Sequence, residues 1–308
     1  MRYISAIFYI VFSFSLIICE TYATENKILI KINNQIITSL DIASEIKYLK
    51  AINKDYSKLN KLKAIEIAKK SIVREKIKEL ELKKIIKQLR IDEDFLNNFV
   101  VNNFNRLGIT SINDFNNFFS SRDLNPVSIK EKITVEILWN QLIYNKFHKS
   151  VKIDKQKIKK ELMQNNKQKE YFLSEIIFNL TADENLKDKL KIIKKEINEN
   201  NFSQAALSYS ISSTNNNGGN LGWIKDSVLS PKIKKQINKT QIGQITNPIV
   251  IPGGFLILKI EQIRETKKDL NIEKEMEIII KEKTNEQLNQ FSNIYFNKIK
   301  KNTNINVL

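Results

Sequence analysis

The seven residues 217–223 (Asn-Gly-Gly-Asn-Leu-Gly-Trp) constrain the fold of this chain more than any other stretch. They hold three of the protein's seven glycines, Gly218, Gly219 and Gly222. Because glycine is scarce elsewhere, we expect the backbone here to need positive φ or a close approach to another segment. Other prolines and glycines, which typically mark turns and helix ends, follow in the order Pro231, Gly243, Pro248, Gly253 and Gly254.

The first 23 residues have the form of a secretory signal peptide. Met-Arg-Tyr precedes an apolar run over residues 4–18, and Thr21-Tyr22-Ala23 provides a cleavage site with small residues. The run is short for a membrane-spanning helix, which needs about 20 apolar residues, although an uncleaved anchor is the alternative. No later window is similarly apolar. We therefore expect a periplasmic protein with no stable membrane span after signal cleavage.

Cys19 is the only cysteine, so a chain cleaved after Ala23 contains none. No disulfide is then available, and stability must come from packing, which a chain of this length can supply. The single histidine is His148, and one isolated imidazole without cysteines does not indicate a metal site. We expect neither a metal nor a cofactor.

The net charge of +17 raises the question of nucleic-acid binding. The excess is mostly lysine, spread along the chain and mixed with glutamate. There is no arginine-rich run and no alternation of basic and aromatic residues of the kind that stacks bases. A solvated charged surface is the preferred interpretation, and no nucleic-acid partner is expected. A basic structural or nucleic-acid-binding protein is the least favoured alternative.

The region after the signal is expected to be mainly helical. Residues 27–32 alternate like a half-buried strand, Asn33-Asn34 indicates a turn, and residues 35–37 form a short return strand. Thr38 and Asp41 have the spacing of a capping box at the start of a helix. Helical patterns continue to about residue 167. One face of a long amphipathic segment collects Leu62, Ile65, Ile72, Leu80, Ile86 and Leu89.

The pattern changes near Tyr171 to mixed strands and helices. Residues 172–178 are expected to form a strand, and Thr181 to Glu184 to cap a helix reaching about residue 200. A short helix over 202–207, a loop over 208–221, a helix from Pro231 and a strand over 255–263 follow. The glycine-rich stretch 217–223 therefore lies inside an α+β unit.

The chain turns helical again over residues 272–300 and ends with a possible strand at 305–307. A single helix cannot bury its own apolar stripe, so this one must dock elsewhere. We expect it to return to the first helical region, which makes the α+β unit an insertion. The expected fold class is α+β, a mostly helical N-terminal domain completed by a C-terminal helix.

Five motifs, in this order and spacing, resemble one known family. They are residues 31–41 (Lys-Ile-Asn-Asn-Gln-Ile-Ile-Thr-Ser-Leu-Asp), 201–210 (Asn-Phe-Ser-Gln-Ala-Ala-Leu-Ser-Tyr-Ser), 218–223, 242–249 (Ile-Gly-Gln-Ile-Thr-Asn-Pro-Ile) and 253–255 (Gly-Gly-Phe). The chain resembles SurA-type periplasmic chaperones and peptidyl-prolyl isomerases, in a version with one parvulin domain. The resemblance implies a signal peptide at 1–23, a helical chaperone domain at 24–168, a parvulin-like domain at 169–265, and a C-terminal helix at 266–308 packing on the N-terminal domain.

The resemblance also implies a proline-binding pocket. Prolyl isomerisation needs no nucleophile, because its barrier of about 18–20 kcal/mol comes from the partial double bond of the peptide. An apolar pocket that grips proline can favour the twisted state. The implied pocket residues are Leu221, Leu229 and Ile233, with Ile224 nearby. The alternative is that these are ordinary core residues, which a small α+β domain also needs.

The polar part of the implied site departs from the family pattern. Glu175 stands where active parvulins carry the histidine of the first strand, and Leu256 where they carry the second histidine. Ser212 stands near the family's cysteine or aspartate. We treat Glu175 and Ser212 as degenerate catalytic positions that could share a hydrogen bond, and Leu256 as part of the pocket. Because losing one preorganised group typically costs about 10²–10³ in rate, activity is expected to be weak.

The favoured function is a periplasmic chaperone that holds unfolded outer-membrane or other exported polypeptides and binds proline-containing segments. Such clients expose aromatic, alternating strands before insertion. The helical region carries aromatic residues that could meet them or form its core: Phe95, Phe99, Phe104, Phe115, Phe118, Phe119, Trp139 and Tyr144. The alternative is a catalytically active prolyl isomerase for exported proteins.

Overall fold

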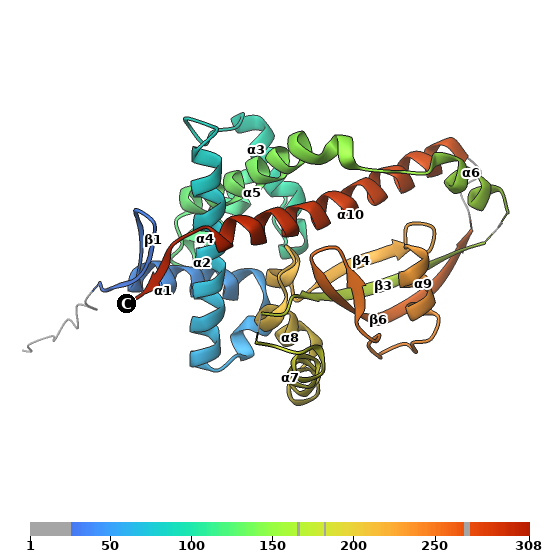
Figure 1. Ribbon diagram of the computed structural model, residues 1–308. Coiled ribbons are helices and arrows are strands. Elements are labelled where there is room, and N and C mark those ends of the chain that lie inside the picture. The colour runs from blue at the N-terminus through green and yellow to red at the C-terminus, as the bar shows by residue number, and fades with distance from the viewer. Residues whose placement is uncertain (1–25, 165–166, 182, 268–271) are drawn as a thin grey trace, which may run out of the picture.

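The computed structural model describes residues 26–164, 167–181, 183–267 and 272–308 (Figure 1). It has the mixed α+β architecture predicted from the sequence, with a large helical region and a sheet-containing region. The signal peptide expected at residues 1–23 lies outside the described residues. None of the helices in the described part of the chain is long and apolar enough to cross a membrane.

Six helices precede the sheet-containing region along the described chain. They are α1 (Ser39–Ile52), α2 (Lys61–Lys83), α3 (Glu93–Phe104), α4 (Ile112–Ser120), α5 (Pro126–Phe147) and α6 (Lys155–Gln164). Short 3-10 turns, η1 (Lys54–Lys58), η2 (Asn105–Leu107) and η3 (His148–Ser150), lie between some of them. Helix α5 begins as expected, with Asn125 as its N-cap and Pro126 in its first turn.

The expected hairpin opens the helical region. Strands β1 (Ile28–Ile32) and β2 (Gln35–Thr38) pair antiparallel, and β7 (Ile305–Val307) from the other end of the chain pairs with β1. Thr38 Oγ1 accepts a hydrogen bond from the Asp41 amide at 3.3 Å, and Asp41 Oδ2 accepts one from the Thr38 amide at 2.7 Å. The capping box predicted from the sequence is therefore present.

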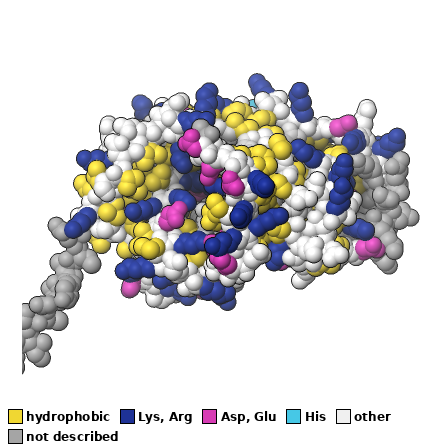
Figure 2. Space-filling model, turned by 60° about the horizontal axis from the view of Figure 1, so that its bottom comes forward, with side chains coloured by type: hydrophobic (Ala, Val, Ile, Leu, Met, Phe, Trp, Pro, Cys, Tyr) yellow, Lys and Arg dark blue, Asp and Glu magenta, His cyan; other side chains and the backbone are white. Residues whose placement is uncertain are grey.

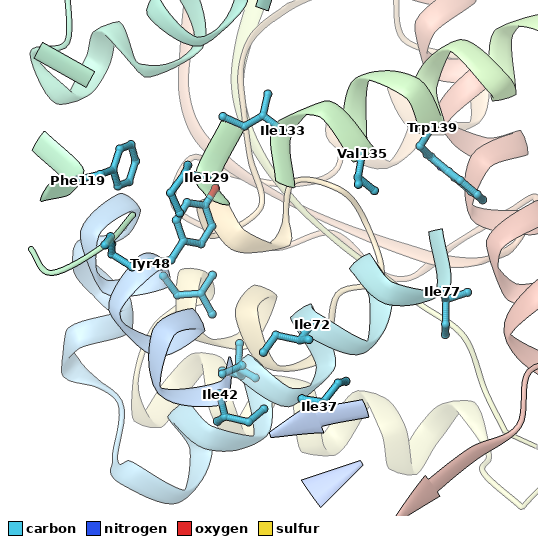
Figure 3. Packing of buried hydrophobic residues seen from close by; sticks show 14 of the residues in the cluster. Ile37, Ile42, Tyr48, Ile72, Ile77, Phe119, Ile129, Ile133, Val135 and Trp139 are labelled. Carbon is cyan, nitrogen blue, oxygen red and sulfur yellow. The ribbon is translucent and has the colours of Figure 1, made fainter. Parts of the chain in front are cut away.

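Apolar side chains from β2, α1, α2, α4 and α5 converge in one core (Figure 3). Phe115, Phe119 and Trp139 are fully buried in it. The predicted buried face of residues 62–89 is partly wrong. Leu62 is 81% exposed, because it lies in the first turn of α2 on the side away from the core, and α2 ends at Lys83. Ile86 and Leu89 reach the same core from the segment after the helix.

The sheet-containing region has a four-stranded antiparallel sheet in the order β4-β3-β6-β5. Its strands are β3 (Lys167–Phe178), β4 (Asn220–Lys225), β5 (Ile249–Ile251) and β6 (Gly254–Lys267), and its helices are α7 (Leu186–Glu199), α8 (Phe202–Tyr209) and α9 (Pro231–Ile237). The 3-10 turn η4 (Asn215–Asn217) lies in the loop before β4. Side chains alternate along β3, so Ile176 packs toward α7 and α8, whereas Leu173 and Ile177 pack toward α9.

The predicted start of α7 is wrong by several residues. The helix begins at Leu186, and Asn185 is its N-cap, with its side chain accepting from the Asp188 amide at 2.9 Å. Thr181 and Glu184 form a separate turn, in which Glu184 Oε2 accepts from the Thr181 amide at 3.1 Å. Both Thr181 and Asn185 have side chains that can cap a helix, and Asn185 is the one that caps α7.

Helix α10 (Ile272–Lys301) runs along both regions in Figure 1, past α6 and the four-stranded sheet to α5 and α2. At one end, Trp139 Nε1 donates to Ser292 Oγ at 2.8 Å, and the Trp139 ring stacks on Tyr295. From the same turn of α10, Ile294 reaches the sheet-containing region, where a Cβ placed on Gly253 would lie 3.3 Å from Ile294 Cγ1. The helix thus contacts both the helical core and the turn between β5 and β6.

Candidate functional site

The glycine-rich segment makes the close approach that its composition predicts. Gly218, Gly219 and Gly222 all have positive φ, at 66°, 77° and 75°. The carbonyl of Gly219 accepts from the Glu175 amide at 2.7 Å. A Cβ on Gly219 would lie 2.1 Å from the Glu175 carbonyl oxygen, closer than two unbonded atoms can approach. Glycine therefore lets this loop lie directly against β3 at Glu175.

Glu175 is the centre of a buried polar cluster and is 8% exposed. Ser212 Oγ donates to Glu175 Oε1 at 2.5 Å, which is the hydrogen bond expected from the sequence. Thr214 Oγ1 donates to the same oxygen at 2.9 Å and lies 3.2 Å from Ser212 Oγ. Thr214 was missed at the sequence level, although a second hydroxyl two residues after Ser212 was a visible signal.

Burial raises the pKa of the Glu175 carboxyl above its ordinary value of 4.5, and the hydrogen bonds from Ser212 and Thr214 oppose that shift. The folded protein therefore binds this proton more tightly than the unfolded chain does. The stability linked to Glu175 is fully present below pH 4.5 and is lost as the pH rises through the higher pKa of the folded state.

We expect Glu175→Gln to gain stability relative to the unsubstituted protein as the pH is raised from 4 to 8, because glutamine does not ionise. The measurement is urea unfolding of both proteins at each pH. Taking the difference between their free energies of unfolding removes the contribution of the ionisable groups that both proteins contain. The control is Glu184→Gln. The Lys189 hydrogen bond lowers the pKa of Glu184, so this variant should lose relative stability over the same range. Parallel pH profiles for the three proteins would contradict the assignment.

The implied pocket residues belong to one apolar cluster on the face of the sheet that carries Glu175. Leu229, Ile233 and Leu256 are buried in it, and Leu221 and Ile224 are partly buried against it. Leu256 pairs with Ile177 across β3 and β6, whereas Glu175 pairs with Leu258. Since alternate residues share a face, Leu256 lies on the same side as Glu175, two residue pairs along the ladder. The sheet therefore brings together Glu175 and Leu256, the two positions where the resemblance implies histidines in active parvulins.

A cleft of about 590 Å³ lies between this region and α10. Leu229, Ile233 and the exposed Val250 line one wall, and Glu286 and Gln287 of α10 line the other. Burial raises the pKa of Glu286, and the negative charge of Glu175 adds to that shift. Leu221, Ile224 and Leu256 are not among the residues that line the cleft. Two of the five implied pocket residues thus reach its surface.

The remaining candidates for chemistry lie elsewhere. His148 is exposed in η3, where its ring stacks on Tyr144 and its Nδ1 lies 3.0 Å from the Tyr144 carbonyl oxygen. Within the described ranges, no group of three or more His, Cys, Asp or Glu side chains is arranged to hold a metal ion. The ionisable side chains among the residues that line the cleft are carboxylates and lysines.

Comparison with known families decides what the sheet-containing region is. Residues 173–262 match the family model described as Rotamase, the PPIC-type PPIASE domain. This segment is a PPIC-type domain. It contains the glycine-rich loop, Glu175, Ser212 and all five implied pocket residues. The parvulin resemblance drawn from the sequence is confirmed, and it places the segment among peptidyl-prolyl isomerase domains at the level of the family.

Parts of the chain are similar to chaperone SurA proteins, as predicted. It is 26% identical to chaperone SurA of Pseudomonas putida over 187 residues, which cover 57% of this chain and 44% of that protein. It is 31% identical to chaperone SurA of Methylobacillus flagellatus over 94 residues, covering 30% of this chain and 21% of that protein. The chain spans less than half the length of these curated relatives.

Solved structures with related sequences include a PpiC-type peptidyl-prolyl cis-trans isomerase domain. It is 30% identical and covers 33% of this chain and 96% of its own, with a TM-score of 0.30. A structure described among two SurA-like chaperones of Campylobacter jejuni is 16% identical. It covers 92% of this chain and 99% of its own, with a TM-score of 0.37.

Proposed function

We propose that this protein is a periplasmic chaperone for unfolded outer-membrane and other exported polypeptides, with a PPIC-type domain that binds proline-containing segments and isomerises them weakly. The observation that carries the proposal is a PPIC-type domain that keeps its apolar cluster, in which the resemblance assigns Glu175 and Leu256 to the positions of the family's two histidines. The pocket can still bind proline, but Glu175 and Leu256 cannot act as the missing imidazoles.

The helical region offers aromatic side chains to clients at a few positions only. Phe95 is 54% exposed and lies against Phe99, and Tyr144 is 51% exposed. Phe115, Phe119 and Trp139 are buried, so they form the core and cannot meet a client without unfolding. Exposed apolar side chains can bind extended client strands through contacts that need no sequence specificity.

The positive charge is distributed in a way that suits a soluble chaperone better than a nucleic-acid-binding protein. Figure 2 shows Lys and Arg side chains spread over the whole visible face, with hydrophobic side chains between them. Many lysines are also neutralised locally, as in the pairs Lys225–Glu275 and Lys234–Asp226. A duplex is bound through a connected basic surface, and this face does not present one.

Two assays on the full-length protein test the proposal. The first is binding of acetyl-Ala-Leu-Pro-Phe-amide, with the same peptide carrying Ala for Pro as reference. The second is the rate of prolyl isomerisation in that peptide. We expect preferential binding of the proline peptide, and a rate at least about 100-fold below that of a parvulin with both histidines, since each lost group costs about 10²–10³. A rate equal to that of such a parvulin would instead show an active isomerase.

A pair of surface variants locates the binding site. Val250→Asp puts a charge on the apolar wall of the cleft at a residue that is already 57% exposed, so folding is not at risk. We expect it to weaken proline-peptide binding about tenfold, because the charge must be desolvated when the ligand binds. Ile192→Asp on α7, where the residue is 48% exposed, is the matched control. Equal binding by both variants would place the site elsewhere.

The chaperone part of the proposal is tested by light scattering of an unfolded outer-membrane protein during dilution from urea. We expect the full chain and both variants to suppress aggregation equally, because Val250 and Ile192 lie outside the helical region. If the full chain leaves aggregation unchanged, the chaperone function is wrong.

A further inference from the structure

Side chains of the helical region hold the backbone of the loop that builds the polar cluster. Asn53 Nδ2 donates to the Asn216 carbonyl at 3.0 Å, and Lys70 Nζ donates to the Ser208 carbonyl at 3.4 Å. Arg74 on α2 donates through Nη1 to the Ser212 carbonyl at 3.1 Å and through Nη2 to the Ile211 carbonyl. Arg74 thus binds the backbone of the residue whose hydroxyl bonds Glu175.

Arg74 is itself fixed from several sides. Its guanidinium lies 5.3 Å from the ring centroid of Phe296 on α10. The carboxylate of Glu136 on α5, which pairs with Lys78 at 2.6 Å, is close enough to interact with its charge. The planar fork of a guanidinium can bind two oxygens at once in a fixed geometry, which an ammonium cannot do. The two loop carbonyls are therefore held by a rigid, well-packed donor.

The other backbone bonds of Ile211 and Ser212 lie within the PPIC-type domain. The Ile211 amide donates to the Ile177 carbonyl at 2.6 Å, and the Ser212 amide donates to Ser210 Oγ at 3.2 Å. The Ser212 carbonyl also accepts from the Asn215 amide at 3.2 Å. The Ile211 amide thus ties the loop to β3, and Arg74 of the helical region binds the carbonyls of Ile211 and Ser212. Those contacts act on the short stretch between Ile211 and Thr214.

We infer that Arg74 is a positioning residue for the PPIC-type site, holding the Ile211 and Ser212 carbonyls so that the hydroxyls of Ser212 and Thr214 remain on Glu175. Arg74 lies outside residues 173–262, so the domain's site is completed by the helical region. The consequence for proline binding rests on the proposed function. The consequence for loop order does not depend on any ligand.

Three full-length variants test this role. Arg74→Met removes both donors, and Arg74→Lys keeps the positive charge near Glu136 but cannot bind both carbonyls in the same geometry. Arg122→Met is the matched control. Arg122 also donates to a backbone carbonyl, that of Phe118 at 2.7 Å, and lies over the Phe118 ring, but within the helical region alone.

The first readout is hydrogen exchange of amides in residues 210–219, compared with those of β3. We expect roughly tenfold faster exchange in the loop for Arg74→Met, an intermediate change for Arg74→Lys, and no change for Arg122→Met, since only Arg74→Met removes both charged hydrogen bonds to the loop. The second readout is affinity for acetyl-Ala-Leu-Pro-Phe-amide. We expect it to fall about tenfold in Arg74→Met, by a smaller factor in Arg74→Lys, and not at all in Arg122→Met.

The outcomes separate this inference from the proposed function. If loop exchange in Arg74→Lys and Arg74→Met matches the unsubstituted protein, the positioning role is wrong whatever the peptide does. If the unsubstituted protein binds no proline peptide, the proposed function fails, and the exchange experiment still decides the role of Arg74. If Arg74→Met does not fold, the comparison of Arg74→Lys with Arg122→Met decides it.

Discussion

Trp139→Ala is expected to lower the free energy of unfolding of the helical region by about 3–5 kcal/mol, the range for truncating a buried aromatic residue. The Trp139 side chain is completely buried. Its ring stacks on Tyr295 at a centroid distance of 5.8 Å and meets Phe296 edge-on at 6.3 Å. Because both partners lie on α10, the substitution removes much of the apolar surface that docks this helix. The measurement is urea unfolding followed by circular dichroism at 222 nm.

Trp139→Phe provides the control. It keeps an aromatic ring between α5 and α10 but loses the hydrogen bond from Nε1 to Ser292 Oγ, so we expect a loss of about 1–2 kcal/mol. If Trp139→Ala and Trp139→Phe lose the same amount, ring packing is not what docks α10. In both variants Trp223, the other of the chain's two tryptophans, remains as a fluorescent reporter in the PPIC-type domain.

Local signals in the sequence predicted the parts of this fold that depend on near neighbours. Thr38 and Asp41 form the expected capping box, because its partners lie three residues apart, and Gly219 has the expected positive φ, because glycine itself marks such a position. The start of α7 was misplaced because two consecutive segments could both cap a helix. Choosing Asn185 over Thr181 depends on where the helix packs against the sheet, which no local pattern states.

The candidate site was predictable only as far as family resemblance extends. Resemblance indicated Glu175 and Ser212, and the structure places them in hydrogen-bond contact, although their catalytic role stays a prediction. Arg74 lies 138 residues before Ser212, and Glu286 lies on a helix outside the PPIC-type domain. Contacts at that separation depend on how α2 and α10 pack on the PPIC-type domain. The domain boundaries at 24–168, 169–265 and 266–308 likewise stay predictions.

Gly219→Ala is expected to destabilise the PPIC-type domain by about 2–5 kcal/mol, from left-handed backbone strain of about 1–2 kcal/mol and overpacking of about 1–3 kcal/mol. At φ +77° its Cβ would lie 2.1 Å from the Glu175 carbonyl oxygen and 3.1 Å from Ala206 Cβ. Neither contact can be relieved by rotating a flexible side chain. The loop must therefore move off β3, taking Ser212 and Thr214 away from Glu175.

Gly243→Ala separates the two contributions. Gly243 has a similar φ of +84°, but a Cβ there would meet no atom within 4 Å among the described residues. It should therefore show the strain alone, about 1–2 kcal/mol. Both variants are made in a Trp139→Phe background, so that Trp223 fluorescence reports unfolding of the PPIC-type domain. Equal losses would mean that dihedral strain, and not contact with β3, explains the glycine at position 219. A larger loss for Gly219→Ala, accompanied by weaker proline-peptide binding, would show that this contact shapes the pocket.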